Sequence, residues 1–344
     1  MISNLVLQAN FVTNNFLTRK GVYTGLAYDP NNVTFDKAGQ FRLVLSDRGT
    51  FSGSTLLAGG MYPFIGRFWV DGKTTVRIVR PGKSPLIHQL AIDLVGGNGI
   101  SGTLSDGSFT VPLQADWSVF VPTNPAPYAG RYTMIVPGTG EVAGDGVGVV
   151  NMSLGGSVVL AGTLADGTVI TRSAPVSKGG MWPLYVPLYT GKGMLISWGQ
   201  FETNGTKSVN GDAVWTKNPM PGKYYTNGFT LLSSVAGGQY VAPAVGPTNR
   251  VMNLTNGTVA LTDGNLSPGI TNSLELADNN VVLITGTNGL KLAINKANGM
   301  VNGSFIHPES KQVTPVKAVV QQGQANFQGF FRGTNESGRI LLFP

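Results

Sequence analysis

Residues 116–133 read DWSVFVPTNPAPYAGRYT, and residues 212–226 repeat the same skeleton as DAVWTKNPMPGKYYT. A weaker copy, LQANFVTNNFLTRKGVYT, occupies residues 7–24. Each copy leads from a strand-like stretch with an aromatic residue into a new start of Gly, Tyr and Thr, and the first two pass through closely spaced prolines. The recurrence predicts a tandem array. The copy at residues 7–24 resembles the tail of a preceding unit.

This junction predicts the domain boundaries. We expect a tail strand and linker at 1–20, β domains at 21–121, 130–217 and 222–344, and linkers at 122–129 and 218–221. Proline fixes φ, so the linkers should be stiff spacers and the array a rod. Trp117, Trp215, Gly130 and Gly222 are the residues expected to form the structural junctions.

The pattern along the units is that of β-strands. Apolar residues alternate with others, as in Phe41, Leu43 and Leu45, which buries one face of a strand. Asp-Gly and Asn-Gly pairs recur between the strands and favour type I′ hairpins, so sequence neighbours should pair. The fold class is therefore all-β, with about three tandem antiparallel meander barrels, or β-sandwiches as the alternative. The first unit offers strands near 22–28, 40–46, 49–57, 61–70, 73–80, 86–94, 99–104 and 108–119.

Four glycines follow alternating apolar stretches at a nearly constant spacing: Gly53, Gly102, Gly162 and Gly303. A glycine inside a strand marks a bulge, a bend or a close approach of two backbones. We interpret these four as the strand-bend positions that let each sheet curl towards closure.

Composition excludes several kinds of site. The chain has 344 residues and no cysteine, so disulfides and thiolate metal sites are excluded. Only 12% of the residues are charged, about half the usual share. No apolar run reaches the ~18 residues of a membrane helix, so we expect no membrane insertion. The net charge of +7 favours polyanions, but without Lys/Arg runs or spaced stacking aromatics we expect no nucleic-acid partner.

Catalytic chemistry has few candidates. The two histidines, His88 and His307, lie far apart in the sequence, and no Ser-His-Asp pattern accompanies them. Glu202 and Asp212 flank one loop and could face each other, but most aspartates sit in turns, where they cap their own backbone. We therefore expect no enzyme activity, no catalytic residue, no metal and no cofactor.

Aromatic side chains near residues 182–189 are the remaining binding candidates. If Trp182 and the following even positions point into a core, Tyr185 and Tyr189 point outward, with Lys192 in the next turn. Such tyrosines either stack on sugar rings or lie beneath a neighbouring loop or domain. The three residues form a candidate polysaccharide-binding site.

Several strings resemble repeat regions of very large, uncharacterised secreted or cell-surface proteins of verrucomicrobia-type environmental bacteria. They are GVYTGLAYD at 21–29, SDRGTFSG at 46–53, GMVNGSFIHP at 299–308 and GFFRGTNESG at 329–338. The resemblance implies an extracellular, modular setting and no catalytic residue.

These observations favour a non-enzymatic extracellular structural or adhesive segment at the cell surface. It could assemble with itself into a rod or fibre through strand pairing of residues 5–11, or join upstream domains of a longer chain. The alternative is a carbohydrate-binding module of a larger surface protein or of a polysaccharide-degrading enzyme.

Overall fold

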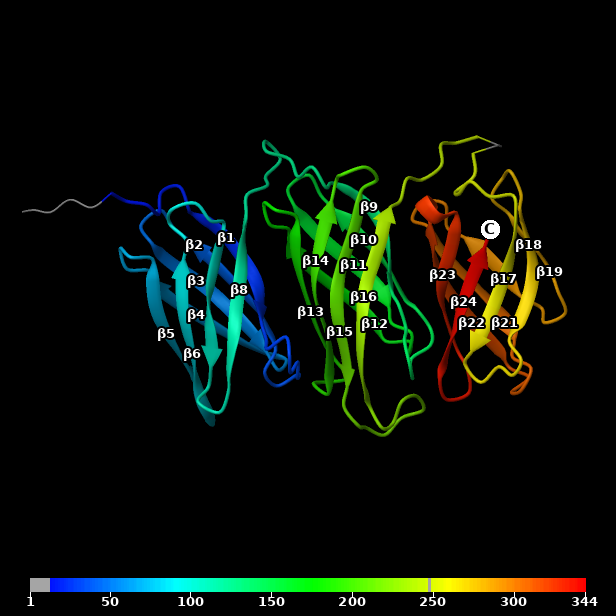
Figure 1. The fold of residues 1–344 in the computed structure, drawn as a ribbon, viewed down its shortest axis with the longest axis horizontal. Coiled ribbons are helices and arrows are strands. Elements are labelled where there is room, and N and C mark those ends of the chain that lie inside the picture. The colour runs from blue at the N-terminus through cyan, green and yellow to red at the C-terminus, as the bar shows by residue number, and fades with distance from the viewer. Residues whose placement is uncertain (1–12, 247–248) are drawn as a thin grey trace, which may run out of the picture.

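The computed structural model describes residues 13–246 and 249–344, which form three eight-stranded antiparallel sheets. Each sheet curls into a nearly closed barrel, and the three barrels stand side by side with their strands running across the row (Figure 1). We call them the first, second and third barrel in chain order. The expected fold class of tandem antiparallel barrels is confirmed.

The strands account for nearly all the regular structure of the described residues. The first barrel contains β1 (Gly21–Ala27), β2 (Gly39–Leu45), β3 (Thr50–Leu57), β4 (Gly60–Arg67), β5 (Lys73–Arg80), β6 (Lys83–Ile92), β7 (Gly99–Ser105) and β8 (Thr110–Ser118). The second contains β9 (Gly130–Val136), β10 (Gly146–Met152), β11 (Ser157–Thr163), β12 (Val169–Pro175), β13 (Met181–Leu188), β14 (Gly193–Glu202), β15 (Ser208–Lys217) and β16 (Phe229–Gln239). The third contains β17 (Asn256–Asp263), β18 (Ile270–Leu276), β19 (Val282–Thr285), β20 (Lys291–Ile294), β21 (Met300–Ile306), β22 (Val313–Gln321), β23 (Asn326–Arg332) and β24 (Ser337–Phe343), with the 3₁₀ turn η1 (Gln322–Gln324) between β22 and β23.

Each barrel is an up-and-down meander with one open seam. The first sheet has the order β4-β3-β2-β1-β8-β7-β6-β5, so its first and last strands pair and its seam lies between β4 and β5. The second sheet repeats this order, with β9 paired to β16 and a seam between β12 and β13. In the third sheet β17 pairs with β24, and the seam lies one strand earlier, between β19 and β20. Pairing of the end strands protects edges that could otherwise pair with other chains.

The alternating apolar residues fill the barrels as the pattern predicts. Phe41, Leu43 and Leu45 on β2 are all buried in the first core. The eight strands expected in the first unit coincide with β1–β8 to within a few residues. Close-packed side chains therefore occupy the interiors of these barrels.

The hairpins differ from the expected turn type. At residues 69–73 the Trp69 amide donates to the Lys73 carbonyl (3.0 Å) and the Gly72 amide to the Trp69 carbonyl (2.9 Å), with Gly72 at φ 77°. This is a three-residue loop with a left-handed glycine, not a two-residue type I′ turn. Among the expected Asp-Gly and Asn-Gly pairs, Asp263-Gly264 has positive φ at both residues, as type I′ requires.

The expected boundary between the second and third units needs correction. β16 pairs along its length with β15 and through Ala236–Gln239 with β9, so the second sheet extends to residue 239. The linker expected at 218–221 is part of the loop between β15 and β16, and the third sheet starts at Asn256 rather than near 222. The copy of the junction at residues 116–133 therefore connects two barrels. The copy at residues 212–226 connects two strands of one barrel. Without β16, both β15 and β9 would expose an unpaired edge.

The start of the chain is described from Thr13 onward. The tail strand expected within residues 1–20 and the strand pairing expected for residues 5–11 fall on residues 1–12, outside the described ranges. Phe16, inside them, packs into the first core and stacks on Phe68 at 6.4 Å. No helix in the described part of the chain is long and apolar enough to cross a membrane.

Candidate functional site

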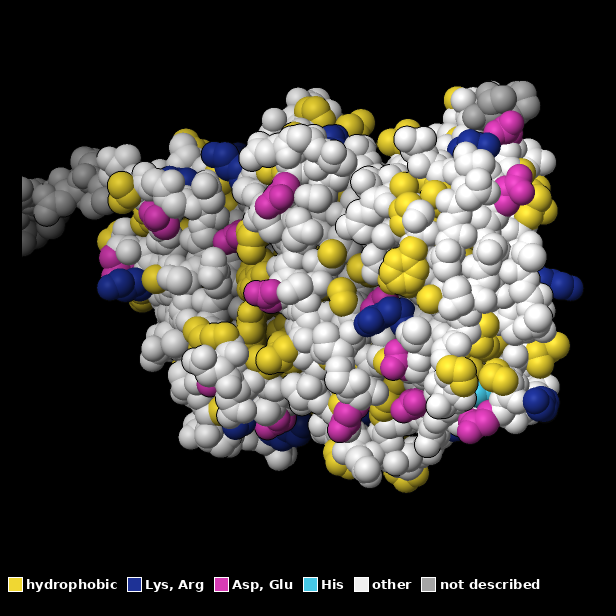
Figure 2. Space-filling model, turned by 45° about the vertical axis from the view of Figure 1, so that its right-hand side comes forward, with side chains coloured by type: hydrophobic (Ala, Val, Ile, Leu, Met, Phe, Trp, Pro, Cys, Tyr) yellow, Lys and Arg dark blue, Asp and Glu magenta, His cyan; other side chains and the backbone are white. Residues whose placement is uncertain are grey.

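The contacts between barrels are the most distinctive feature of the surface. Charged side chains are sparse, and hydrophobic side chains gather in the crevices between neighbouring barrels (Figure 2). We call the contact between the first and second barrels the first joint, and that between the second and third barrels the second joint.

The first joint is built on an apolar cluster around Tyr185. Tyr185 on β13 is 0% exposed and packs in one cluster with Leu26 and Leu56 of the first barrel and Met194 and Ile196 of the second. Burial raises the pKa of Tyr185 above its ordinary value. Because the first barrel covers its ring, Tyr185 is not the sugar-stacking residue expected, and the alternative of a tyrosine beneath a neighbouring domain holds.

Tyr189 lies at one end of the second barrel in a polar network. Its hydroxyl donates to Asp166 Oδ2 (2.7 Å) and accepts from Trp215 Nε1 (2.9 Å), and the Lys217 ammonium lies 5.1 Å from its ring centre. Burial, and then the Asp166 carboxylate, raise the pKa of Tyr189 above its ordinary value. The partners of the Tyr189 side chain, Asp166, Trp215 and Lys217, all belong to the second barrel.

Lys192 is exposed, whereas Tyr185 is buried in the first joint and Tyr189 is turned toward Asp166. The candidate ligand site formed by these three residues is therefore not assembled. The failure has a physical cause: alternation on a strand separates inward from outward, but it does not show which outward residues a second barrel covers.

The junction residues occupy unlike places. Trp117 on β8 stacks on its cross-strand partner Tyr23 with ring centres 6.4 Å apart, closing one end of the first core. Trp215 is 1% exposed inside the second core rather than at a boundary. Gly130 begins β9 with φ 150°, whereas Gly222 lies in the loop between β15 and β16 with open space around it.

The four strand glycines share one geometry. A Cβ added at any of them would lie too close to a carbonyl oxygen of the adjacent strand for a normal contact. The distances are 2.5 Å to Arg42 O for Gly53, 2.0 Å to Gln89 O for Gly102, 2.6 Å to Val147 O for Gly162 and 2.1 Å to Lys291 O for Gly303. At these positions glycine permits close backbone approach between paired strands.

Both histidines are enclosed by their barrels, although His88 Nδ1 has no hydrogen-bond partner within the described residues. His88 is 0% exposed inside the first barrel, where its Nε2 lies 2.9 Å from Thr55 Oγ1 and its ring lies against Phe41 and Phe64. Burial lowers the pKa of His88 to about 4, so it is neutral at pH 7. His307 is equally buried, and its Nε2 lies 3.0 Å from the Gly264 carbonyl.

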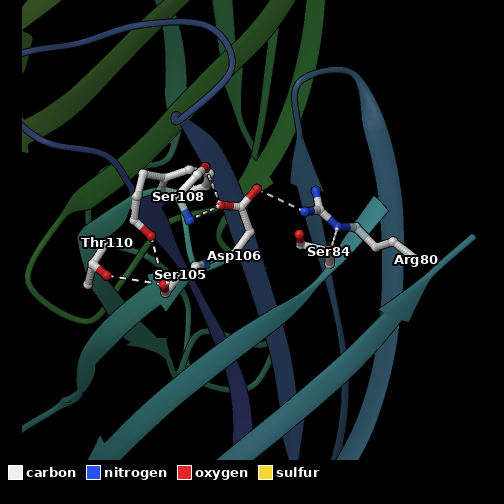
Figure 3. Close-up of polar contacts among 8 residues, drawn as sticks. Arg80, Ser84, Ser105, Asp106, Ser108 and Thr110 are labelled. Carbon is white, nitrogen blue, oxygen red and sulfur yellow. Dashed lines mark hydrogen bonds and ion pairs between the residues drawn. The ribbon is translucent and has the colours of Figure 1, made fainter. Parts of the chain in front are cut away.

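The carboxylates are mostly tied to turns or ion pairs. Asp106 accepts from the Ser108 amide (3.0 Å) and hydroxyl (2.7 Å), and its other oxygen lies 3.0 Å from Arg80 Nη2 (Figure 3). Arg80 Nε also donates to the Ser84 carbonyl at 2.7 Å, which fixes the guanidinium (Figure 3). This arrangement fastens the turn between β7 and β8 to β5.

Glu202 and Asp212 do not form a catalytic pair. Glu202 pairs in register with Ser208, and Asp212 lies four residues farther along β15, roughly 13 Å away at the usual strand rise. Asp212 accepts from Ser234 Oγ at 3.1 Å. Within residues 13–246 and 249–344, no three His, Asp or Glu side chains gather closely enough to hold a metal ion.

The second joint contains a buried ion pair. The Asp145 side chain is 3% exposed, and Arg339 from β24 lies 3.1 Å from its Oδ1. Arg339 Nη2 also donates to the Gly138 carbonyl at 2.7 Å. Burial raises the pKa of Asp145, and the Gly138 amide and Arg339 offset part of that effect.

Further hydrogen bonds cross the same joint. The Asp145 amide donates to the Gly329 carbonyl (3.2 Å), and Thr133 Oγ1 donates to the Val320 carbonyl (2.6 Å). The Tyr225 hydroxyl lies 2.5 Å from Ser337 Oγ and accepts from the Ser337 amide (2.8 Å). Val319 and Phe330 of the third barrel pack into the core cluster of the second barrel, so the polar contacts surround an apolar centre.

Comparison with known proteins assigns no family. No protein family and no curated protein matches this chain. It is similar to crystal structures titled transferrin binding protein B, from Haemophilus parasuis (9% identity, 94% of this chain and 74% of that chain, TM-score 0.22) and from Neisseria meningitidis (9% identity, 94% and 76%, TM-score 0.22). A protein of unknown function from Nostoc punctiforme also matches (10% identity, 66% and 98%, TM-score 0.20). Similarity at this level assigns neither a family nor a function.

Proposed function

We propose that this chain is a non-enzymatic, extracellular structural or adhesive segment that holds three β-barrels in a fixed row, spacing or displaying other parts of a surface protein. The observation that carries the proposal is the burial of both joints. Tyr185 is fully enclosed between the first and second barrels, and the carboxylate of Asp145 is enclosed between the second and third.

The connection between the first two barrels supports the same proposal. The backbone amide of Ala126, between Pro125 and Pro127 of the linker, donates to the Leu154 carbonyl of the second barrel at 2.8 Å, and Ala126 is 3% exposed. The Lys178 amide of the second barrel donates to the Trp117 carbonyl at 2.9 Å. A linker bonded to its barrel in this way limits bending between the units more than proline stiffness alone would.

Both histidines and three of the aspartates have structural roles in the described barrels. His88 and His307 are enclosed, and Asp106, Asp145 and Asp166 hold turns or joints together. The resemblance of several strings to repeat regions of large secreted or surface proteins supports the proposed extracellular setting.

Small-angle X-ray scattering of the full chain tests the fixed row. A single elongated particle whose dimensions match the row in Figure 1 is expected, unchanged between low and high salt. A distribution of intramolecular distances that requires independently moving barrels would contradict the proposal.

The non-enzymatic part has its own test. We expect no turnover on a panel of polysaccharides and esters. Turnover that a single point substitution abolishes would show that the chain is an enzyme.

A further inference from the structure

The first joint leaves a groove beside the cluster of Tyr185. It has a volume of about 930 Å³ and is lined by β1–β4 and β8 of the first barrel, the segment that follows β8, and β11 and β12 of the second barrel. That volume is in the range of ligand-binding sites, which run from about 300 to 1,000 Å³. Both barrels contribute walls, so the groove exists because the joint holds them in place.

The charges in this groove are all positive. Lys20, Arg42 and Arg172 line it, and no Asp or Glu does. The ion pairs of the described residues involve Arg80, Arg250 and Arg339, and residues 1–12 contain no Asp or Glu that could neutralise the groove. With only 41 charged side chains of both signs in the chain, three unpaired cations in one groove are a marked concentration.

A second hollow beside the same joint has the opposite character. It has a volume of about 590 Å³, and its charged lining residues are Asp93 and Asp116. β1 reaches both hollows, with Val22 and Thr24 in the basic groove and Leu26 in the acidic hollow. The joint therefore separates positive from negative charge along one strand, and the basic groove has a specific electrostatic preference for anions.

Two residues that line the basic groove each have an enclosed polar atom without a protein partner. The Nε of Arg172 and the hydroxyl of Ser118 are both buried and form no hydrogen bond within the described residues. Arg172 Nη2 donates to Gln40 Oε1, and Gln40 Nε2 donates to the Pro183 carbonyl at 3.4 Å, which orients the guanidinium. A buried donor without a partner is costly, and a ligand oxygen would satisfy it only after the enclosed side chain turns toward the groove.

We propose that this groove binds an acidic polysaccharide, with uronate carboxylates placed against Lys20, Arg42 and Arg172. Guanidinium groups form strong paired hydrogen bonds with carboxylates. The sugar hydroxyls would form hydrogen bonds with hydroxyl groups of the lining. The lining hydroxyls are those of Thr24, Ser54, Ser118, Ser157 and Ser173.

The lining favours a sugar polymer over a nucleic acid. Single-stranded nucleic acids bind to basic grooves in which successive bases stack on aromatic rings. The aromatic residues here are Trp117 and Phe120. Trp117 already stacks on Tyr23, and Phe120 packs edge-on against Tyr128 at 6.1 Å, so neither forms a row of free stacking faces.

Binding of the full chain to polygalacturonate, measured by isothermal titration calorimetry at several salt concentrations, tests the proposal. Neutral dextran and a single-stranded oligonucleotide are the comparison ligands. We expect binding to polygalacturonate that weakens with salt, and none to dextran. Equal binding to dextran, or no binding to polygalacturonate at low salt, would overturn the proposal, and tighter binding of the oligonucleotide would assign the groove to nucleic acid instead.

Two double variants with the same loss of charge separate the groove from net charge. Lys20→Gln with Arg42→Gln removes two groove cations and is expected to weaken binding about tenfold or more. Lys73→Gln with Arg77→Gln removes two exposed cations from β5 of the same barrel and should change binding less than about twofold. Equal weakening by both would show that only net charge matters.

The inference rests on the fixed placement of the first two barrels but not on an extracellular role. Scattering measured on the same samples distinguishes the two failures. If the row stays intact and polygalacturonate does not bind, only the polysaccharide site is wrong, whereas a flexible array would overturn the proposed structural function as well.

Discussion

The two joints hold neighbouring barrels by different means. The first is an apolar cluster around Tyr185 with a few hydrogen bonds beside it, such as Lys178 to Trp117, and no ion pair among the described residues crosses it. The second has the buried Asp145–Arg339 pair and hydrogen bonds from backbone and side chains. Apolar contact is non-directional and stabilises roughly in proportion to the area buried, so open space can remain beside it. The basic groove occupies such a space beside the Tyr185 cluster. Polar contacts require defined geometry, so the second joint should fix orientation more strictly.

The largest expected effect is loss of the apolar joint. Tyr185→Ala removes a fully buried ring from the first joint and should lower the free energy of unfolding by about 4 kcal/mol. Urea denaturation and calorimetry measure the change. Leu232→Ala, which truncates a 71% exposed side chain of the second barrel, is the matched control and should cost less than about 0.5 kcal/mol. Equal effects of the two substitutions would mean that the first joint contributes little.

The polar joint should respond most to loss of one charge. Arg339→Met leaves the Asp145 carboxylate buried without its partner and should cost about 3 kcal/mol in thermal or urea unfolding. Adding Asp145→Asn removes the unpaired charge and should recover part of the loss. Arg67→Met, at an exposed residue of β4, serves as the control. If the double variant were less stable than Arg339→Met alone, the unpaired carboxylate would not be the cause.

Lowering the pH should reduce the stability of the first barrel's core before it affects the apolar contacts of the first joint. The pKa of His88 falls from 6.5 to about 4 on folding, so the neutral form contributes stability that is full above pH 6.5 and is lost as the pH falls toward 4. The loss for the first barrel should approach about 3 kcal/mol at or below pH 4. Unfolding measured from pH 7 to pH 4 checks this, and His88→Gln should flatten the dependence. An unchanged slope in that variant would assign the acid sensitivity to other groups.

The smallest effect concerns a single hydroxyl of the polar joint. Tyr225→Phe removes the bonds to the Ser337 amide and hydroxyl and should cost about 1 kcal/mol in urea unfolding. Tyr62→Phe, whose hydroxyl forms no hydrogen bond within the described residues, should be near neutral. A neutral Tyr225→Phe would show that this bond merely replaces one to water.

Local patterns predicted the strands and the meander, because alternation and turn residues act over a few positions. Alternation on β2 and the glycine spacing around Gly53 are properties of one or two neighbouring strands. The boundary near 222 was wrong because β16 closes the second barrel through pairing with β9, about a hundred residues earlier in the chain. That pairing leaves no trace in the local pattern, whereas the Pro-containing junction repeats visibly at a place where no barrel ends.

The binding candidates failed for a related reason. Tyr185 has the alternation of an outward residue, and its burial depends on a face of another barrel. The groove joins Lys20, Arg42 and Arg172, which lie in two barrels and far apart in the sequence. Net positive charge was the one signal available for it, and net charge does not locate a site.

The strands run across the row, and this arrangement has a mechanical consequence (Figure 1). A pull along the row on the end of β24 would peel that strand from β17 and β23, loading its hydrogen bonds a few at a time instead of shearing the ladder together. Compression along the row would instead press the barrels against one another through their buried joints. The three barrels should therefore resist shortening and bending better than stretching, as a spacer needs and a load-bearing tether does not.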